Sequence, residues 1–230
     1  MTSKDTATLK RGDTRTRLIL AAEKLFGERG IHSVTLKEIN VAAGQRNESA
    51  LHYHFGSKAA LVNAIMQHRV KVIDAHRIAA IEALLQQGRE RELRPLLQAS
   101  FQPMIELLGS EDGVRFVRFL AQVLNDPDFD LPSIALSSGF EGIKSSNALI
   151  VAALGDLPPE IAVQRQRFIV EMAVSSLAIW TRHHDAVAET AARELFSANL
   201  FDSIVGFMTA PVSSETLEAL KKTAKKKDRK

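Results

Sequence analysis

The chain has 230 residues, of which 45% are hydrophobic and 25% charged, a balance typical of globular rather than disordered proteins. It contains no cysteine, which excludes disulfides, thiolate zinc sites and cysteine nucleophiles, and the reducing cytoplasm is therefore the expected compartment. The first residues have no apolar core, and no later stretch approaches the roughly 18 consecutive apolar residues of a membrane span. Neither export nor membrane insertion is expected.

The net charge of +3 is unevenly distributed along the chain. Residues 1–58 carry ten Lys and Arg against six Asp and Glu, residues 59–210 carry 13 against 18, and residues 211–230 carry seven against three. Two basic ends therefore flank an acidic middle. A basic block of this size indicates contact with a polyanion, and a solvated charged face is the alternative.

The predicted secondary structure is entirely helical, because β-branched residues are scattered through Ala- and Leu-rich segments and no run alternates with period two. After a flexible basic arm at residues 1–12, a first helix is predicted from Asp13 or Thr14 to Arg29, with Gly30 at its C-terminal end. Apolar residues recur along it at helical spacing and must face a partner: Leu18, Ala21, Ala22, Leu25 and Phe26.

The second predicted helix is short and ends before Gly44. The sequence "TLKE" at its start matches a capping box, in which the Thr35 hydroxyl accepts from the Glu38 amide and the Glu38 side chain returns to the cap. A third helix is predicted from the N-cap Asn47 to Phe55. Two short helices joined by a glycine-containing turn, after a longer supporting helix, have the layout of a helix-turn-helix unit.

Ser57 is the predicted N-cap of a fourth, longer helix that ends near Gln87 and connects two parts of the chain. Further helices are predicted at 92–108, with a kink at Pro103, and at 111–125, 131–154, 159–184 and 187–209. The predicted fold class is all-α, with a helix-turn-helix domain at 13–57 and a helical bundle at 58–210. The lysine-rich residues 211–230 are expected to form a mobile tail that either touches DNA phosphates or is inert.

The last two predicted helices, 159–184 and 187–209, offer more apolar surface than one packing face requires. We expect one side to pack inward and the other to pack against a second subunit, forming a homodimer. The alternative is that both are central core helices.

The histidines are not expected to form a metal site. His52 and His54 are two residues apart on a helix, so their side chains project roughly 200° apart, whereas ligand pairs on helices are three or four residues apart. His183 and His184 fall near a helix C-terminus and are interpreted as capping or surface residues. The sequence has neither a nucleophile elbow nor a phosphate-binding glycine loop, so no enzyme activity and no cofactor are expected.

DNA recognition is the remaining interpretation, because the second helix of such a unit can enter a major groove. Ser49 and Ala50 have short side chains that allow close approach. Side chains that reach base edges are predicted at Lys37, Asn47, Glu48 and His52. Phosphate contacts are predicted from Tyr53, His54, Ser57 and Lys58. Leu51 and Phe55 belong on the buried side, and an ordinary three-helix core is the alternative for the whole segment.

The stretches "TRTRLILAAEKLFGERG", "VTLKEINVAAG" and "SALHYHFGSKAALV" resemble the TetR family of bacterial transcriptional regulators over about residues 13–66. The resemblance implies a homodimer that binds a palindromic operator and releases it when a small molecule enters the C-terminal domain. It implies DNA contacts by Thr35, Lys37, Glu48, Ser49, Ala50 and His52, with Tyr53, His54 and Lys58 at or beside phosphate-binding positions. The chain departs from the common pattern by one extra turn residue around Gln45 and Arg46.

A pocket for a mainly hydrophobic effector is expected between the middle helices. Its candidate lining residues are Phe101, Met104, Phe116, Phe119, Leu120, Phe140, Met172 and Trp180. Arg115 is a further candidate, because Arg115 and Arg118 share one helix face and could receive an acidic ligand. Pairing of these arginines with Glu111 or Asp112 is the alternative.

The predicted function is that of a repressor whose effector reorients the fourth helix. One alternative is a DNA-binding regulator without a small-molecule switch. A second is a helical metal-dependent hydrolase that uses Glu171, His183 and His184.

Overall fold

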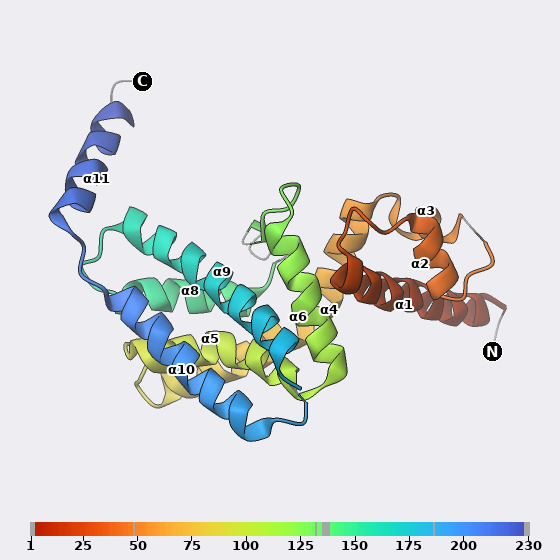
Figure 1. Cartoon of the computed structure of the whole chain (residues 1–230), viewed down its shortest axis with the longest axis horizontal. Helices are drawn as coiled ribbons and strands as arrows, with labels where there is room; N and C mark the ends of the chain where they lie inside the picture. Colours follow the sequence, from red (N-terminus) through yellow and green to blue (C-terminus); the bar gives the residue numbers. More distant parts are fainter. Residues whose placement is uncertain (1–2, 48, 132, 135–138, 186, 228–230) are drawn as a thin grey trace.

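The computed structural model describes residues 3–47, 49–131, 133–134, 139–185 and 187–227, with side chains from Thr14 to Thr223 inside these ranges. All regular secondary structure in these ranges is helical, as predicted. Figure 1 shows the first three helices and the start of the fourth at one end of the molecule, and the remaining helices packed together beyond them.

The first helix is longer than predicted. Helix α1 spans Ser3–Arg29, so the predicted start at Asp13 or Thr14 was wrong. Residues 3–12 have no proline and one glycine, Gly12, which lowers helix propensity without ending a helix. The extension carries no apolar stripe, which is why hydrophobic periodicity did not reveal it.

Helix α2 spans Leu36–Ala42 with Thr35 as its N-cap, and both hydrogen bonds of the predicted capping box are present. Helix α3 spans Ala50–Phe55, and its N-cap is Ser49, so the predicted N-cap Asn47 was wrong. Asn47 Oδ1 instead accepts a hydrogen bond from the Ser49 N–H at 2.9 Å, which closes the turn before the helix.

Helix α4 spans Lys58–Gln86, and the Ser57 side chain accepts from the Ala60 N–H at 3.1 Å, as expected for its N-cap. A single core joins α4 to the three helices before it. The side chains of Phe26, Ile39 and Leu51 have no exposed surface, and Phe55 packs against them. This arrangement confirms the buried side predicted for α3.

The C-terminal bundle follows the predicted helices with two exceptions. Its helices are α5 (Leu93–Glu106), the 3-10 turn η1 (Leu107–Gly109), α6 (Glu111–Asn125), α8 (Glu141–Ala153), α9 (Pro159–His183) and α10 (Thr190–Thr209).

The continuous helix predicted over 131–154 was wrong. Gly139 has φ +77°, a left-handed conformation that ends regular helix, and α8 begins two residues later. Helix α10 also begins later than predicted, because Asp185 Oδ1 accepts from the N–H groups of Val187 and Ala188 and holds these residues in a turn.

The lysine-rich tail, expected to be mobile, is helical from Ser214 to Lys227 (α11). Its Ala, Leu, Glu and Lys residues are strong helix formers, a preference that charge alone does not reveal. Figure 1 shows α11 projecting from the bundle beyond α10.

Among the described residues, no single helix is long and apolar enough to cross a membrane. The segments Thr190–Thr209 and Ser214–Thr223 meet the length and composition criterion only as a pair, with a bend of 63° between them.

Candidate nucleic-acid interface and effector cavity

The capping box fixes the start of α2. Thr35 N donates to Glu38 Oε2 at 2.7 Å, Glu38 N donates to Thr35 Oγ1 at 3.2 Å, and Arg29 Nη2 lies 2.8 Å from Glu38 Oε1. The backbone hydrogen bond from Thr35, with help from the Thr35 hydroxyl and Arg29, lowers the pKa of Glu38 to about 2. The Thr35 hydroxyl, predicted to contact DNA, is therefore also part of the cap.

The residues predicted to face DNA lie on the outer side of α2 and α3. Lys37, Asn47, Ser49, His52, Tyr53 and Ser57 are exposed, and Ala50, His54 and Lys58 are partly buried. Tyr53 keeps 63% of its surface, whereas the neighbouring Leu51 keeps none. Glu48 lies outside the described residues. The rings of Tyr53 and His54 meet edge to face, with 5.3 Å between their centroids.

Lys58 has a structural contact that sequence reasoning did not anticipate. Its Nζ donates to the carbonyl oxygen of Ile31 at 3.0 Å and to that of His32 at 3.4 Å. The ammonium group thus ties the start of α4 to the turn between α1 and α2. A second cation missed from the sequence is Arg15 of α1, whose guanidinium carbon lies 5.2 Å from the centroid of the Phe55 ring.

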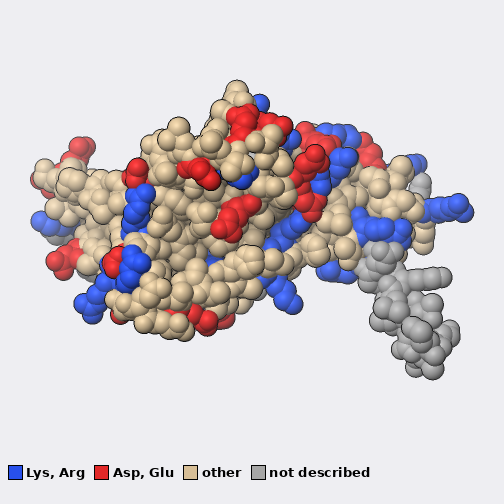
Figure 2. All heavy atoms as spheres, turned by 90° about the horizontal axis from the view of Figure 1, so that it is seen from below, with Lys and Arg blue, Asp and Glu red and all other residues tan. Residues whose placement is uncertain are grey.

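Positive charge gathers at the end of the molecule formed by these helices. Figure 2 shows Lys and Arg side chains over this end, and most Asp and Glu side chains over the middle of the molecule. The exposed basic residues of the described N-terminal helices and turns are Arg15, Arg17, Lys24, Arg29, Lys37 and Arg46.

A charge cluster formed by Glu23, Arg69 and Asp112 joins the two parts of the chain. Arg69 Nε and Nη2 of α4 each donate to the Glu23 carboxylate of α1 at 2.6 Å, and Nη2 lies 3.1 Å from Asp112 Oδ2 of α6. Glu23 is 1% exposed. The hydrogen bonds to Glu23 raise the pKa of Arg69. We call this group the inter-domain charge cluster.

A cavity of about 350 Å3 lies in the bundle between α4, α5, α6, α8 and α9. Four of the predicted lining residues surround it: Phe101, Met104, Phe116 and Leu120. Helix α4 supplies four more that sequence reasoning missed, namely Met66, Val70, Ile73 and Arg77. Their spacing of four, three and four residues is helical and was visible in the sequence. The volume falls in the range of roughly 300–1,000 Å3 found for small-molecule sites.

The other predicted lining residues lie elsewhere. Phe119 is fully buried and stacks near Phe26 and Phe116, with ring centroids 6.4 and 6.0 Å apart. Trp180 stacks on His184 at 4.7 Å and on Phe196 at 5.2 Å. These rings fill the core.

Phe140 is buried at the start of α8, and Met172 is partly buried against the core. Neither residue lines the cavity.

The two arginines of α6 already have partners in the structure. Arg115 pairs with Asp112 and lies 3.7 Å from Glu111, which agrees with pairing rather than with a ligand contact. Arg118 Nη2 donates to the carbonyl oxygen of Thr181 at 2.9 Å. Neither side chain lines the cavity.

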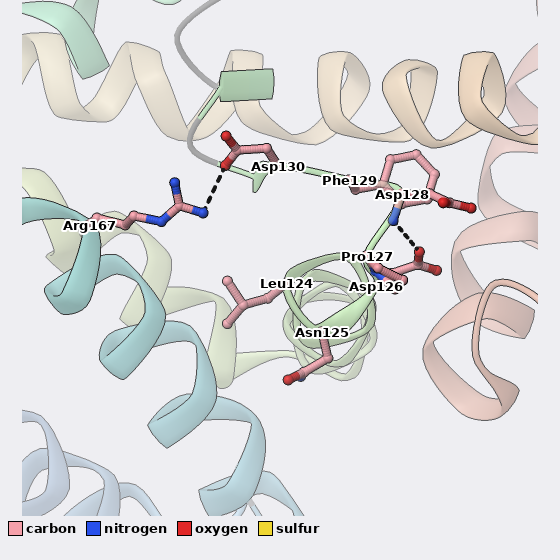
Figure 3. Close-up of a pocket in the computed structure, with 8 residues that line it drawn as sticks. All are labelled: Leu124, Asn125, Asp126, Pro127, Asp128, Phe129, Asp130 and Arg167. Carbon is pink, nitrogen blue, oxygen red and sulfur yellow. Dashed lines mark hydrogen bonds and ion pairs between the residues drawn. The ribbon is translucent and has the colours of Figure 1, made fainter. Parts of the chain in front are cut away.

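A second, more open depression follows the end of α6 and is shown in Figure 3. At its rim Arg167 lies 3.5 Å from Asp130. Nearby, His32 Nε2 lies 3.0 Å from Asp126 Oδ2 and 3.7 Å from Asp128 Oδ2. Donor atoms of these three residues fall within 4.8 Å of one another. Hydrogen bonding accounts for the contacts without an ion.

Both parts of the chain match family models. Residues 18–65 match the model of bacterial regulatory proteins of the tetR family, and residues 98–210 match the model of the tetracyclin repressor-like C-terminal domain. The chain belongs to the TetR family. The first match coincides with the region that carried the sequence resemblance.

One relative of this TetR-family chain is the HTH-type transcriptional repressor BepR of Brucella suis biovar 1 (strain 1330). The two are 32% identical over 107 residues, which cover 46% of this chain and 47% of the repressor. The alignment therefore spans about half the length of that relative.

Solved structures share the fold. A tetR family transcription regulator from Shewanella sp. PV-4 superposes with a TM-score of 0.59 at 16% identity, covering 83% of this chain and 97% of its own. PfmR from Thermus thermophilus, a TetR family transcriptional regulator, gives 0.50 at 21% identity, covering 82% and 96%.

The residues of the hydrolase alternative do not come together in this TetR-family fold. His184 Nδ1 lies 2.8 Å from Glu189 Oε2, and Glu171 accepts from Arg167 at 3.1 Å. Within the described ranges, the three-donor group that could hold a metal is His32, Asp126 and Asp128, and it does not include these residues.

Proposed function

We propose that this TetR-family chain is a sequence-specific DNA-binding regulator, and that it acts in the cytoplasm as a homodimeric repressor. The observation that carries the proposal is the two-sided structure of α3. Leu51 is fully buried while His52 and Tyr53 next to it are exposed, so the helix is anchored by one side and presents polar groups on the other. An exposed helix of this kind can enter a major groove.

The proposed contacts follow from the exposed groups of α2 and α3. Lys37, Asn47 and His52 can reach base edges, and Ser49 and Ala50 permit close approach. Glu48, Tyr53, His54 and Ser57 remain proposed contacts from the sequence. Thr35 and Lys58 are proposed to act at the phosphates while also holding the cap of α2 and the turn before it.

The proposed dimer uses the outer faces of α9 and α10. Large apolar side chains are exposed there, with Leu195 at 73% and Val163 at 62%. Phe168 and Phe207, one from each helix, meet edge to face with 6.1 Å between ring centroids. Burial against a second copy would remove this apolar surface from water.

The cavity supports control by a small, mainly apolar effector. Phe116 lines the cavity, and the guanidinium carbon of Arg69 lies 5.9 Å from the centroid of its ring. Arg69 in turn binds Glu23 of α1. A molecule that displaces α4 would thereby act on the helix that supports the DNA-binding unit. Recognition helices of a dimer must match grooves about 34 Å apart, so a small rotation is enough to lose one half-site.

The same cavity weighs against a regulator without a small-molecule switch, which would have a filled core. Repression, rather than activation, is supported by the relative named as a transcriptional repressor, which is 32% identical over the aligned part.

Selection of bound sequences from random DNA with the purified full-length chain tests the proposal. We expect enrichment of a palindrome, binding of a dimer, and affinity that falls steeply with salt because phosphate contacts release counterions. Absence of any enriched sequence would overturn the proposed function. Enrichment of a site without two-fold symmetry would overturn the homodimeric form of it.

A further inference from the structure

Arg77 places a buried positive charge in a cavity that is otherwise mainly apolar. Its side chain is 11% exposed and lines the cavity from α4. Around it lie apolar side chains such as Val70, Ile73 and Phe101. A guanidinium is rarely buried without anionic or carbonyl partners, because removal from water costs several kcal/mol for an ion, by order of magnitude.

The protein satisfies only part of this guanidinium. Nη1 donates to Asp74 Oδ1 at 2.7 Å, and Nε donates to the carbonyl oxygen of Ser100 at 3.0 Å. Nη2 has no hydrogen bond to any residue within the described ranges. Burial lowers the pKa of Arg77, and the hydrogen bond to Asp74 offsets this only in part. The charged form would therefore gain from a further acceptor.

Asp74 cannot give Arg77 its full charge, because it is shared. Its Oδ2 accepts from the Gly142 N–H at 2.9 Å, and its Oδ1 accepts from the Ile143 N–H at 3.0 Å as well as from Arg77. Both amides belong to the first turn of α8, where a carboxylate is favoured. Asp74 is thus committed to α8, and part of the Arg77 charge remains available to a ligand.

The other charged groups of the cavity are at its rim. Arg167 is half exposed and lies between Asp130 at 3.5 Å and Glu171 at 3.1 Å. Two carboxylates therefore already neutralise this rim arginine.

We propose that the effector of this chain is an amphipathic monocarboxylate, with its apolar body among the aliphatic and aromatic side chains and its carboxylate on Arg77. The inference rests on the proposed function, since it names the chemical class of the effector. Because Arg77 and Asp74 share α4 with Arg69, a carboxylate that draws Arg77 away from Asp74 would loosen α4 from α8 at the same time.

The test uses pairs of probes that differ only in the head group. Binding of octanoate, 1-octanol and octylamine, and of 1-naphthaleneacetate and 1-naphthaleneethanol, is measured by calorimetry with the full-length protein at neutral pH. We expect the acid to bind at least about tenfold more tightly than the alcohol in one of the pairs, as for a charge-assisted hydrogen bond in a desolvated site. If neither acid is preferred over its alcohol, the proposal is overturned.

Three variants locate the preference. Asp74→Asn frees Arg77 and should tighten acid binding. The double variant Asp74→Asn with Arg77→Met removes both charges, so no unpaired buried ion remains to unfold the chain, and it should lose the acid preference while still binding the alcohol. Arg167→Gln at the rim is the matched control and should keep the preference. Loss of the preference in the control, with retention in the double variant, would overturn Arg77 as the anchor.

These measurements contain no DNA, so the two ideas can fail separately. Failure of the DNA selection would remove the proposed function and leave an acid-binding cavity. Failure of the acid preference would remove the present inference and leave the regulator.

Discussion

Two arginines on α4, Arg69 and Arg77, are both largely buried but differ in how completely the protein neutralises them. Arg69 makes two 2.6 Å hydrogen bonds to Glu23 and a third contact to Asp112, and its pKa is raised. Arg77 shares one carboxylate with a helix terminus, and its pKa is lowered. The first arginine is saturated and joins two domains, whereas the second retains capacity for a ligand.

This difference explains how one helix can serve two purposes. Four residues on the inner side of α4 line the cavity, and Arg69 on the same helix binds α1. A rigid contact at one end and an unsatisfied charge at the other let a bound molecule act on α4 without first breaking the domain interface. The predictions below test each side of the comparison.

The largest effect is expected at the inter-domain charge cluster. Arg69→Met leaves Glu23 buried without its cation and should lower the free energy of unfolding by about 3–5 kcal/mol, as for a broken buried ion pair. Urea denaturation of the purified protein measures the loss. The control is Arg69→Met combined with Glu23→Gln, which should recover much of it. A single variant as stable as the parent chain would contradict the saturated character of this cluster.

A smaller effect is expected where α8 approaches Asp74. A Cβ atom at Gly142 would lie 2.7 Å from Asp74 Oδ1 and 3.0 Å from the Asp74 carbonyl oxygen. Gly142→Ala should therefore destabilise the chain by about 1–3 kcal/mol through overpacking. Gly206→Ala in α10 is the matched control, since nothing lies within 4 Å of its Cβ position. Equal thermal stability of the two variants would show that Asp74 is not held tightly against α8.

DNA binding extends the comparison to a cation that is only partly buried. Lys58→Ala should weaken binding to all sequences and reduce the slope of log affinity against log salt by roughly one unit, whereas His52→Ala should change which bases are preferred. Titration of the selected site and of mismatched sites at several salt concentrations separates the two. If Lys58→Ala lowers stability and leaves the salt slope unchanged, its ammonium serves the Ile31 and His32 carbonyls alone.

The smallest effect is expected at the exposed charge of the α2 capping box. The pKa of Glu38 is lowered from 4.5 to about 2 in the folded chain, so the carboxylate stabilises the fold above pH 4.5 and this contribution is lost as the pH falls toward 2. Glu38→Gln should reduce the dependence of unfolding on pH within that window. Acid titration followed by circular dichroism compares the variant with the parent chain, and identical curves would contradict the assignment.

The N-terminal part was the more predictable region because its signals are local. The capping box at Thr35, the N-cap at Ser57 and the buried Leu51 all follow from residues within a few positions of each other. Errors occurred where the local signal was weak. Residues 3–12 lack an apolar stripe, and Gly139 interrupts a segment whose composition is helical.

The effector region was less predictable because burial decides it. Large apolar residues were reasonable candidates, yet Phe119 and Trp180 fill the core while Phe101 and Met104 line the cavity. Composition cannot distinguish these cases, since both kinds of residue are apolar and lie on amphipathic helices.

The order of residues alone was enough to predict the all-α fold class, most helix positions and the family, because helix periodicity, caps and turn glycines act over a few residues. Which arginine is saturated and which remains available depended on folding. Arg69 and Glu23 lie 46 positions apart, as do other partners that meet only when helices pack. Electrostatic interactions weaken steeply with distance and solvent exposure, so the same side chain acquires its role from neighbours that the packed helices supply.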